Sequence, residues 1–211
     1  GLLQYPEIKN VSFSLNTPSA TINKWWTGFK YKSMPDESSV ELKFVDSVYL
    51  KMFDVLTIAG VSTIEGDSGL NIVVNESLTR EMGLDQPEKA VGEVFEYAGK
   101  RATIVGVVKD FQTVSLHEGM HPVLNTRQEN NFQKVSVKID IRHARDAINH
   151  LETQWKAAFP EYYFTYDFLD EQLATFYKEE KKISRLLVAF ALVAVSIGCV
   201  GLLGLIMFVS A

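Results

Sequence analysis

The chain has 211 residues, 46% of them hydrophobic, which suits one large folded domain or two small ones. Its net charge of −5 comes from interspersed charges of both signs, which excludes a nucleic-acid-binding protein because phosphate recognition needs clustered lysine and arginine. The single cysteine, Cys199, excludes an internal disulfide and a cysteine-based metal site built from this chain alone.

The first 45 residues predict mainly β-structure. Residues 1–8 resemble the end of a helix that stops near Pro6, so we expect the chain to be a piece of a longer protein. Three segments then alternate apolar and polar side chains, the pattern of half-buried strands, at residues 11–15, 25–31 and 40–45.

The middle of the chain predicts short helices and strands in mixed order. Asn75 is expected to cap a helix that runs through Met82, because its side chain can accept a free backbone N–H, and Gly83 ends that helix. The other expected elements are a helix at 47–53, a strand at 72–74, and a hairpin of strands 95–97 and 101–108.

The last third of the soluble part predicts a strand, a helix and a second strand, which is a compact α+β unit. These elements are expected at 135–139, 144–158 and 162–169. Asp170 is expected to cap a final helix that contains no proline and therefore continues to the end of the chain as one rod.

An apolar segment closes the chain. Residues 186–211 contain no charged side chain, and as a helix they would reach about 39 Å, more than the roughly 30 Å hydrocarbon core of a bilayer. We therefore predict a transmembrane helix over 184–211. Gly198, Gly201 and Gly204 favour packing against other spans, although glycine is also generally common in membrane helices.

Several strings resemble one known family. They are YLKMFDVLTIAG (49–60), IVVNESLTREMGL (72–84), AVGEVFEYAGKRATIVGVVKDF (90–111) and FPEYYFTYDFLDEQLATFY (159–177), followed by the apolar run. Their order and spacing resemble the MacB-like periplasmic core domain of ABC transporter permeases, a group that includes FtsX-like and LolC-like proteins. The family places arginine after the glycine at position 60, and this chain has Val61 there.

The resemblance implies an α+β fold with two lobes before a transmembrane helix. The porter-like lobe would comprise residues 1–45 and 118–180, and the inserted sabre-like lobe residues 46–117. It also implies a periplasmic domain of a bacterial inner-membrane protein that is not an enzyme and needs no cofactor. The implied partners are a cytoplasmic ABC ATPase, a second permease half in a homodimer or pseudo-dimer, membrane lipid at 186–211 and a periplasmic adaptor.

One string has the form of a catalytic motif. Residues 117–121 spell HExxH, in which a helix presents two histidines to zinc with a glutamate beside the metal-bound water. Gly119 weakens a helix and Pro122 disfavours the helical conformation at His121, so we expect a solvated loop. His143 and His150 offer no third ligand, and no metal-binding residue is expected.

Other candidate sites have simpler explanations. Asp110 follows a strand but has no nucleophile or base partner, so we expect it to cap a turn. Asn75 fits the glycosylation pattern, but capping explains it better. The three tryptophans could line a ligand cleft, but we expect core packing for Trp25, Trp26 and Trp155. No catalytic or cofactor-binding residue is expected.

Two functions fit this organisation. The first is mechanical coupling, in which movement of membrane helices driven by a separate ATPase passes along the rod into the α+β domain and drives export or extraction of a substrate. The second is ligand sensing by the extracytoplasmic domain of a membrane receptor. The residues after Ala211 would discriminate between the two, because a permease continues into further membrane spans and a receptor into a signalling segment.

Overall fold

The chain consists of two compact units. The computed structural model describes residues 1–18, 20, 23–32, 34, 38–66, 70–111 and 120–209. The first unit is Gly1–Gln154 and the second is Trp155–Ala211. Every strand of the described chain belongs to the first unit.

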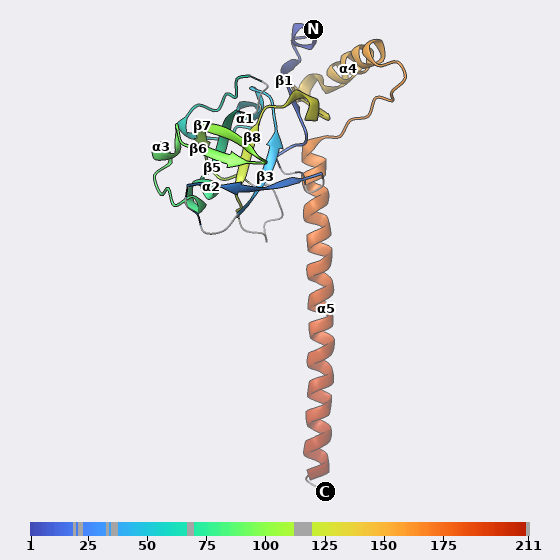
Figure 1. Cartoon of the computed structure of the whole chain (residues 1–211). Helices are drawn as coiled ribbons and strands as arrows, with labels where there is room; N and C mark the ends of the chain where they lie inside the picture. Colours follow the sequence, from blue (N-terminus) through green and yellow to red (C-terminus); the bar gives the residue numbers. More distant parts are fainter. Residues whose placement is uncertain are drawn as a thin grey trace. The chain divides into compact units, whose positions relative to one another are not determined.

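Seven strands of the first unit pair into one sheet in the order β4-β7-β5-β8-β3-β2-β6. Because β6 pairs with β7 as well as with β2, the sheet closes as a six-stranded barrel, and β4 extends it beside the second half of β7. Figure 1 shows β3, β5, β6, β7 and β8 gathered in this unit. The strands are Trp25–Lys30 (β2), Ser38–Phe44 (β3), Thr57–Gly60 (β4), Asn71–Asn75 (β5), Val94–Tyr97 (β6), Lys100–Val108 (β7) and Val123–Thr126 (β8).

The inward side chains of the barrel form its main core. Successive side chains of a strand point to opposite faces, so Val40, Leu42 and Phe44 of β3 share the inner face. Each large apolar side chain buried here stabilises the fold by about 1.5–3 kcal/mol relative to an exposed position. The same cluster contains Phe29, Ile72, Val74, Phe95, Ile104 and Leu124.

A second, smaller core lies on the outer face of β5 and β7. It is built around the short helix α1 (Tyr49–Met52), whose Tyr49 and Leu50 are buried with Val73 and Val108. Asp46 fixes the start of α1 because its carboxylate accepts a hydrogen bond from the N–H of Tyr49 at 2.9 Å. The barrel is therefore covered by apolar packing on this side as well.

β4 and β7 approach so closely that glycine is required on both. A Cβ on Gly106 would lie 1.8 Å from the carbonyl oxygen of Val61, and one on Gly60 would lie 2.3 Å from that of Val105. Gly60 also has φ of +65°, which glycine adopts without strain. Val61, in place of the family's arginine, donates its N–H to Val105 at 3.0 Å and is 53% exposed.

A two-stranded ribbon and one helix complete the first unit. β1 (Ile8–Ser14) pairs antiparallel with β9 (Lys134–Ile139), and the helix that follows, α4 (Ala144–Ala158), belongs to the first unit as far as Gln154. The ring of His150 on α4 stacks on Tyr5 at 4.1 Å between centroids and bonds the carboxylate of Glu7, which ties the helix to the start of β1. The short helices are Leu2–Gln4 (η1), Glu76–Glu81 (α2), Pro87–Ala90 (α3), Glu129–Asn131 (η2) and Ile141–His143 (η3).

The second unit contains an aromatic connection and one long helix. Trp155 contacts the rings of Phe159 and Phe164 at 4.9 and 6.3 Å between centroids, while Tyr163 is 94% exposed. α5 (Leu169–Val209) is a continuous helix of 41 residues, about 62 Å long at about 1.5 Å per residue (Figure 1). The prediction of one uninterrupted rod is thereby confirmed as far as Val209, and residues 210–211 lie outside the described residues.

Most predicted elements are present, but two local predictions are wrong. Residues 162–169 form no strand, because in this segment the side chains of Phe164 and Tyr166 stack on one another and the Tyr162 carbonyl accepts the indole N–H of Trp155. Asp170 is not an N-cap, because α5 begins one residue earlier at Leu169.

Two larger predictions about organisation are not established by the fold. In the residues that the structure describes, no helix is both long and apolar enough to cross a membrane, so the span predicted over 184–211 is not shown. The seven-stranded sheet combines β2, β3 and β8 from the porter-like ranges with β4–β7 from the sabre-like range. The division into two lobes stays a prediction.

Candidate functional site

Two clusters of polar side chains lie near the edge of the barrel where β5 and β7 end and β8 begins. β5 and β7 are parallel neighbours and β8 is antiparallel to β5, so these three chain ends meet at one edge. The Asn75–Asp110 clamp consists of Asn75, Glu76, Ser77, Arg80 and Asp110. The Glu41 cluster consists of Trp26, Glu41, Lys43 and His121.

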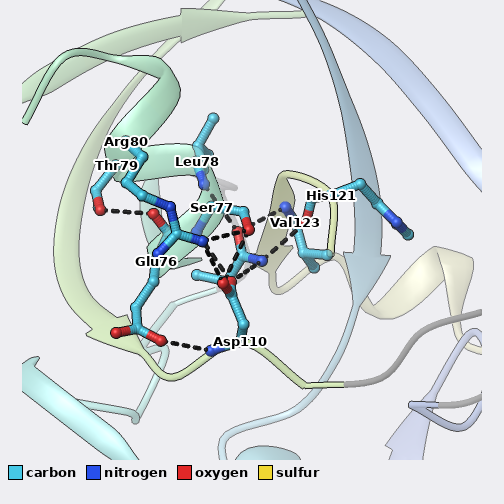
Figure 2. Close-up of polar contacts among 9 residues, drawn as sticks. Glu76, Ser77, Leu78, Thr79, Arg80, Asp110, His121 and Val123 are labelled. Carbon is cyan, nitrogen blue, oxygen red and sulfur yellow. Dashed lines mark hydrogen bonds and ion pairs between the residues drawn. The ribbon is translucent and has the colours of Figure 1, made fainter. Parts of the chain in front are cut away.

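Asp110 is the centre of the clamp. Its carboxylate accepts hydrogen bonds from the side-chain amide of Asn75 at 2.7 Å, from both the N–H and the hydroxyl of Ser77 at 2.9 Å, and from Arg80 at 2.6 Å. Its own N–H donates to the carboxylate of Glu76 at 3.0 Å. Figure 2 shows these groups converging on Asp110 at the start of α2. The Asp110 carboxylate, which follows β7, thus caps α2, which follows β5. The sequence had predicted that Asp110 caps a turn in its own segment.

Asn75 joins the clamp to the start of β8. Its side-chain oxygen accepts the N–H of Leu78 at 3.1 Å, which confirms the predicted N-cap, and also the N–H of Val123 at 2.8 Å. Its amide donates to the carbonyl oxygen of His121 at 2.9 Å. Asn75 is buried with its amide fully engaged, so the alternative of a glycosylated asparagine is wrong.

Glu41 and Lys43 are charged side chains buried on the outer face of β3. Lys43 is 1% exposed and Glu41 0%, and the Lys43 Nζ lies 3.1 Å from the Glu41 Oε1. The other carboxylate oxygen, Oε2, accepts a hydrogen bond from the His121 Nε2 at 2.6 Å. The ring of Trp26 lies over that of His121 at 5.0 Å between centroids, with Trp26 49% exposed.

The electrostatics of the Glu41 cluster follow from this geometry. Burial opposes the charge on Glu41, but the hydrogen bond from His121 and the ammonium of Lys43 outweigh it and hold the pKa of Glu41 below its usual value. Burial lowers the pKa of Lys43, and the attraction of Glu41 offsets only part of that effect. Burial also raises the pKa of Tyr49 well above its usual value, with a contribution from Glu41.

The structure places His121 in a different environment from the one that the zinc motif requires. His121 lies outside any helix, and its ring points away from the clamp that binds its carbonyl oxygen (Figure 2). His117, Glu118 and Gly119 lie outside the described residues. Across residues 1–111 and 120–209, with their gaps, no group of three or more His, Cys, Asp and Glu side chains is placed to hold a metal ion.

The tryptophans are less buried than the sequence predicts. Core packing is wrong for Trp25 and Trp26, since both are close to half-exposed, and Trp25 meets Phe44 edge-on at 5.3 Å. Trp155 belongs to the second unit. Sequence reasoning missed Glu41 and Lys43, because local alternation places them on the polar face of a strand, where exposure is the ordinary outcome.

The polar contacts of the two clusters connect secondary-structure elements and do not form a reactive site. In the clamp, both oxygens of Asp110 are used by protein donors, and so the carboxylate is not poised as a base. In the Glu41 cluster, the amine of Lys43 has no solvent access by which a substrate could reach it. The clusters hold α2, β3, β7 and β8 together at one edge of the barrel.

Comparison with known proteins identifies solved structures with a similar fold. No protein-family model and no curated protein matches the sequence. The structure is similar to the extracellular domain of the ABC-type transporter YknZ from Gram-positive bacteria, with a TM-score of 0.54 and 14% identity, covering 75% of this chain and 80% of that one. It is also similar to the periplasmic region of MacB from Actinobacillus actinomycetemcomitans, with a TM-score of 0.54 and 14% identity, covering 74% of this chain and 70% of that one.

These likenesses agree with the sequence strings at 49–60, 72–84 and 90–111, which fall on α1 and β4, on β5 and α2, and on β6 and β7. The clamp is built from the last two of these strings. The chain therefore has the fold of the extracytoplasmic domains of MacB-type ABC transporter permeases.

Proposed function

We propose that the chain is the extracytoplasmic part of an ABC transporter permease and that it couples ATP hydrolysis on the other side of the membrane to movement of a substrate. The likeness of the fold to extracytoplasmic domains of YknZ and MacB carries this proposal. The first unit supplies a rigid body, because its barrel has a closed sheet, a continuous core and two polar joints at one edge.

The coupling element is α5. A helix transmits displacement along its axis because each backbone N–H is bonded to the carbonyl one turn earlier, and α5 is continuous from Leu169 to Val209. Residues 186–211 carry no charge, and we assign them to the membrane, where they meet the helices that the ATPase drives. The α+β domain would then rearrange as a body against its dimer mate or another partner.

The partners follow from the chemistry that the chain lacks. The sequence contains no glycine-rich phosphate loop, so ATP hydrolysis belongs to a separate ATPase subunit or domain. Its location would be the bacterial inner membrane with the folded units in the periplasm. A second permease half completes the transporter.

Purification of the full-length protein from its native membrane tests this assignment. We expect an ATPase with a phosphate-binding loop to copurify in fixed stoichiometry, and ATPase activity to be lost when the lysine of that loop is replaced. A purified protein without an associated ATPase, or one that continues after Ala211 into a signalling domain, would contradict the proposal.

The coupling step needs its own experiment. A flexible glycine linker inserted at Glu179 would interrupt α5, and we expect ATP hydrolysis to continue while transport stops. A linker of the same length in the connection at residue 161 is the matched control, since that connection is not helical. Unchanged transport with the linker at Glu179 would refute coupling along the helix.

A further inference from the structure

One half of β2 has a free backbone edge. β2 pairs with β3 from Trp25 to Phe29, whereas only Phe29 and Lys30 pair with β6 on the other side. β6 ends at Tyr97, where the chain turns back into β7, so the strand beside β2 stops there. Within the described residues, Trp25–Gly28 therefore has no strand along this side.

The backbone groups of Trp26 and Gly28 point to this free edge. The Glu41 N–H donates to the Pro122 carbonyl at 3.0 Å, so the backbone of Glu41 is directed to the start of β8 and away from β2. Register partners of an antiparallel pair face either toward or away from each other, so Trp26, the partner of Glu41, is directed away from β3. Gly28 has the same direction, while Thr27 between them is directed to β3. An edge of unpaired N–H and C=O groups is a template for another strand.

The outer face of β2 beside this edge presents an aromatic ring and a hollow. Trp26 is 49% exposed, and a hollow of about 240 Å³ at Gly28 is lined by β2, β6 and the turn after β6. Positions two apart on a strand share a face and lie about 6.6 Å from each other, so the ring and the hollow have the spacing of alternate side chains of a neighbouring strand. Glycine within a strand marks a place where another backbone can approach closely.

The charges on this face indicate the kind of partner. Lys24 lies within electrostatic range of Glu41 and Lys43, and Lys30 and Glu96 line the hollow. Three lysines against two glutamates favour an acidic segment, and a second copy of the chain would bring the same positive balance to the edge. We propose that the free edge of β2 binds an extended acidic segment of another protein, which adds a strand to the barrel.

The added strand would use both parts of the surface. Its backbone would pair with Trp26 and Gly28, one of its side chains would pack on the ring of Trp26, and the next side chain on the same face would enter the hollow. The inference depends on the barrel and not on the assignment to a transporter, so its test is separate from that of the proposed function.

Amide hydrogen exchange of the full chain tests whether the edge is free. We expect the N–H groups of Trp26 and Gly28 to exchange at least about tenfold faster than that of Thr27, which is directed to β3. Exchange as slow as that of Thr27 would show that the edge is already covered. Exchange that slows as the protein concentration rises would show that a second copy covers it. Either result would overturn the proposal.

A short synthetic peptide of alternating threonine and valine, with glutamate at both ends, is the probe for the partner. We expect it to slow exchange at Trp26 and Gly28 and to leave Thr27 unchanged. A peptide with N-methylated backbone amides, which cannot pair, and one with lysine at both ends, which the positive surface repels, should each bind at least about tenfold more weakly in titration calorimetry. Absence of binding by the glutamate peptide, or equal binding by all of the peptides, would refute the site.

A substitution locates the binding on β2. In Trp26→Ala, the affinity for the glutamate peptide should fall at least about tenfold, because tryptophan rings anchor interfaces. Tyr163→Ala is the matched control, since Tyr163 is 94% exposed in the second unit and its loss should leave the affinity unchanged. Unchanged affinity in Trp26→Ala would contradict the proposal. Should that variant not fold, the exchange and peptide comparisons on the unmodified chain decide.

Discussion

The clamp and the Glu41 cluster bury charge at the same edge of the barrel by different means. In the clamp, one carboxylate is surrounded by amide, hydroxyl and backbone donors, and its cationic partner Arg80 is 55% exposed. In the Glu41 cluster, a carboxylate and an ammonium are both buried and balance each other, with His121 as a further partner. The clamp depends on hydrogen bonds, whereas the Glu41 cluster depends on charge balance.

This difference determines how each region responds to substitution. Removal of one member of a balanced pair leaves an uncompensated buried charge, while removal of both members leaves none. Removal of one donor from a carboxylate that has several leaves the carboxylate largely satisfied. We therefore expect strong non-additivity in the Glu41 cluster and graded effects in the clamp.

The largest effect is expected for Lys43→Met. The substitution leaves Glu41 charged at a position with 0% exposure, and it should lower the free energy of unfolding by about 3–5 kcal/mol. The double variant Glu41→Met with Lys43→Met should recover most of that loss, because the charge and its need for solvation disappear together. Urea unfolding of the full chain, followed by circular dichroism, measures both.

Lys138→Met is the matched control for that experiment. Lys138 pairs with Asp54 at 3.2 Å on the surface, where the two side chains are 47% and 82% exposed, so its replacement should change stability by less than about 1 kcal/mol. If the double variant were as unstable as the sum of the two single ones, charge balance would not be what holds the Glu41 cluster.

In the clamp, Asp110→Asn should cost about 2 kcal/mol. An amide keeps the shape of the side chain but replaces one carboxylate oxygen with an NH₂ group. This group faces either the side-chain amide of Asn75 and the N–H of Ser77, or the hydroxyl of Ser77 and the guanidinium of Arg80, so that charge-assisted bonds on one side are replaced by opposed donors. Thermal unfolding at constant pH measures the loss. Asp54→Asn, at an exposed carboxylate, is the control, and an equal effect of the two substitutions would show that Asp110 has no special role.

Local patterns in the sequence predicted most helices and strands and, within the clamp, the capping of α2 by Asn75. Apolar alternation located β3 and β9, and an apolar run bounded by asparagines located β5. The capping role of Asn75 was predicted because its side chain can accept a free backbone N–H. The bond from Asn75 to Asp110 joins residues 35 positions apart, and it depends on β5 and β7 being parallel neighbours, which no local pattern encodes. Closure of the barrel through β6 is non-local for the same reason.

The Glu41 cluster was beyond prediction because burial is a property of the assembled fold. In residues 40–45 the polar positions alternate with apolar ones, a pattern typical of a strand with one face in water. In the assembled fold, His121 lies against Glu41, and both Glu41 and Lys43 have almost no exposed surface. His121 was considered only as part of a metal motif, whereas its partner is Glu41, 80 residues away.

Lowering the pH should reduce the contribution of the Glu41 cluster to the free energy of unfolding. The pKa of Glu41 in the folded chain lies below its usual 4.5. As the pH falls below about 4.5, Glu41 therefore binds a proton more readily in the unfolded chain than in the folded one. The free energy of unfolding then decreases until the pH has passed the folded pKa. The stability gap between the unmodified chain and Glu41→Gln should be largest above about pH 4.5 and shrink below it. Urea unfolding at a series of pH values measures this gap, and a gap independent of pH would contradict the role of the charge.

The smallest effect is expected for Arg80→Ala. Arg80 donates to Asp110 and to the Ser77 hydroxyl, but 55% exposure means that water screens its charge and can take its place on the carboxylate. The loss in free energy of unfolding should be less than about 1 kcal/mol and should shrink further as salt is added, because screening weakens exposed ion pairs. Urea unfolding at low and high ionic strength measures both quantities. If Arg80→Ala lowered the free energy of unfolding as much as Asp110→Asn, the arginine would be the main partner that stabilises the carboxylate, and the amide and backbone donors would be secondary. The clamp would then depend on charge, as the Glu41 cluster does.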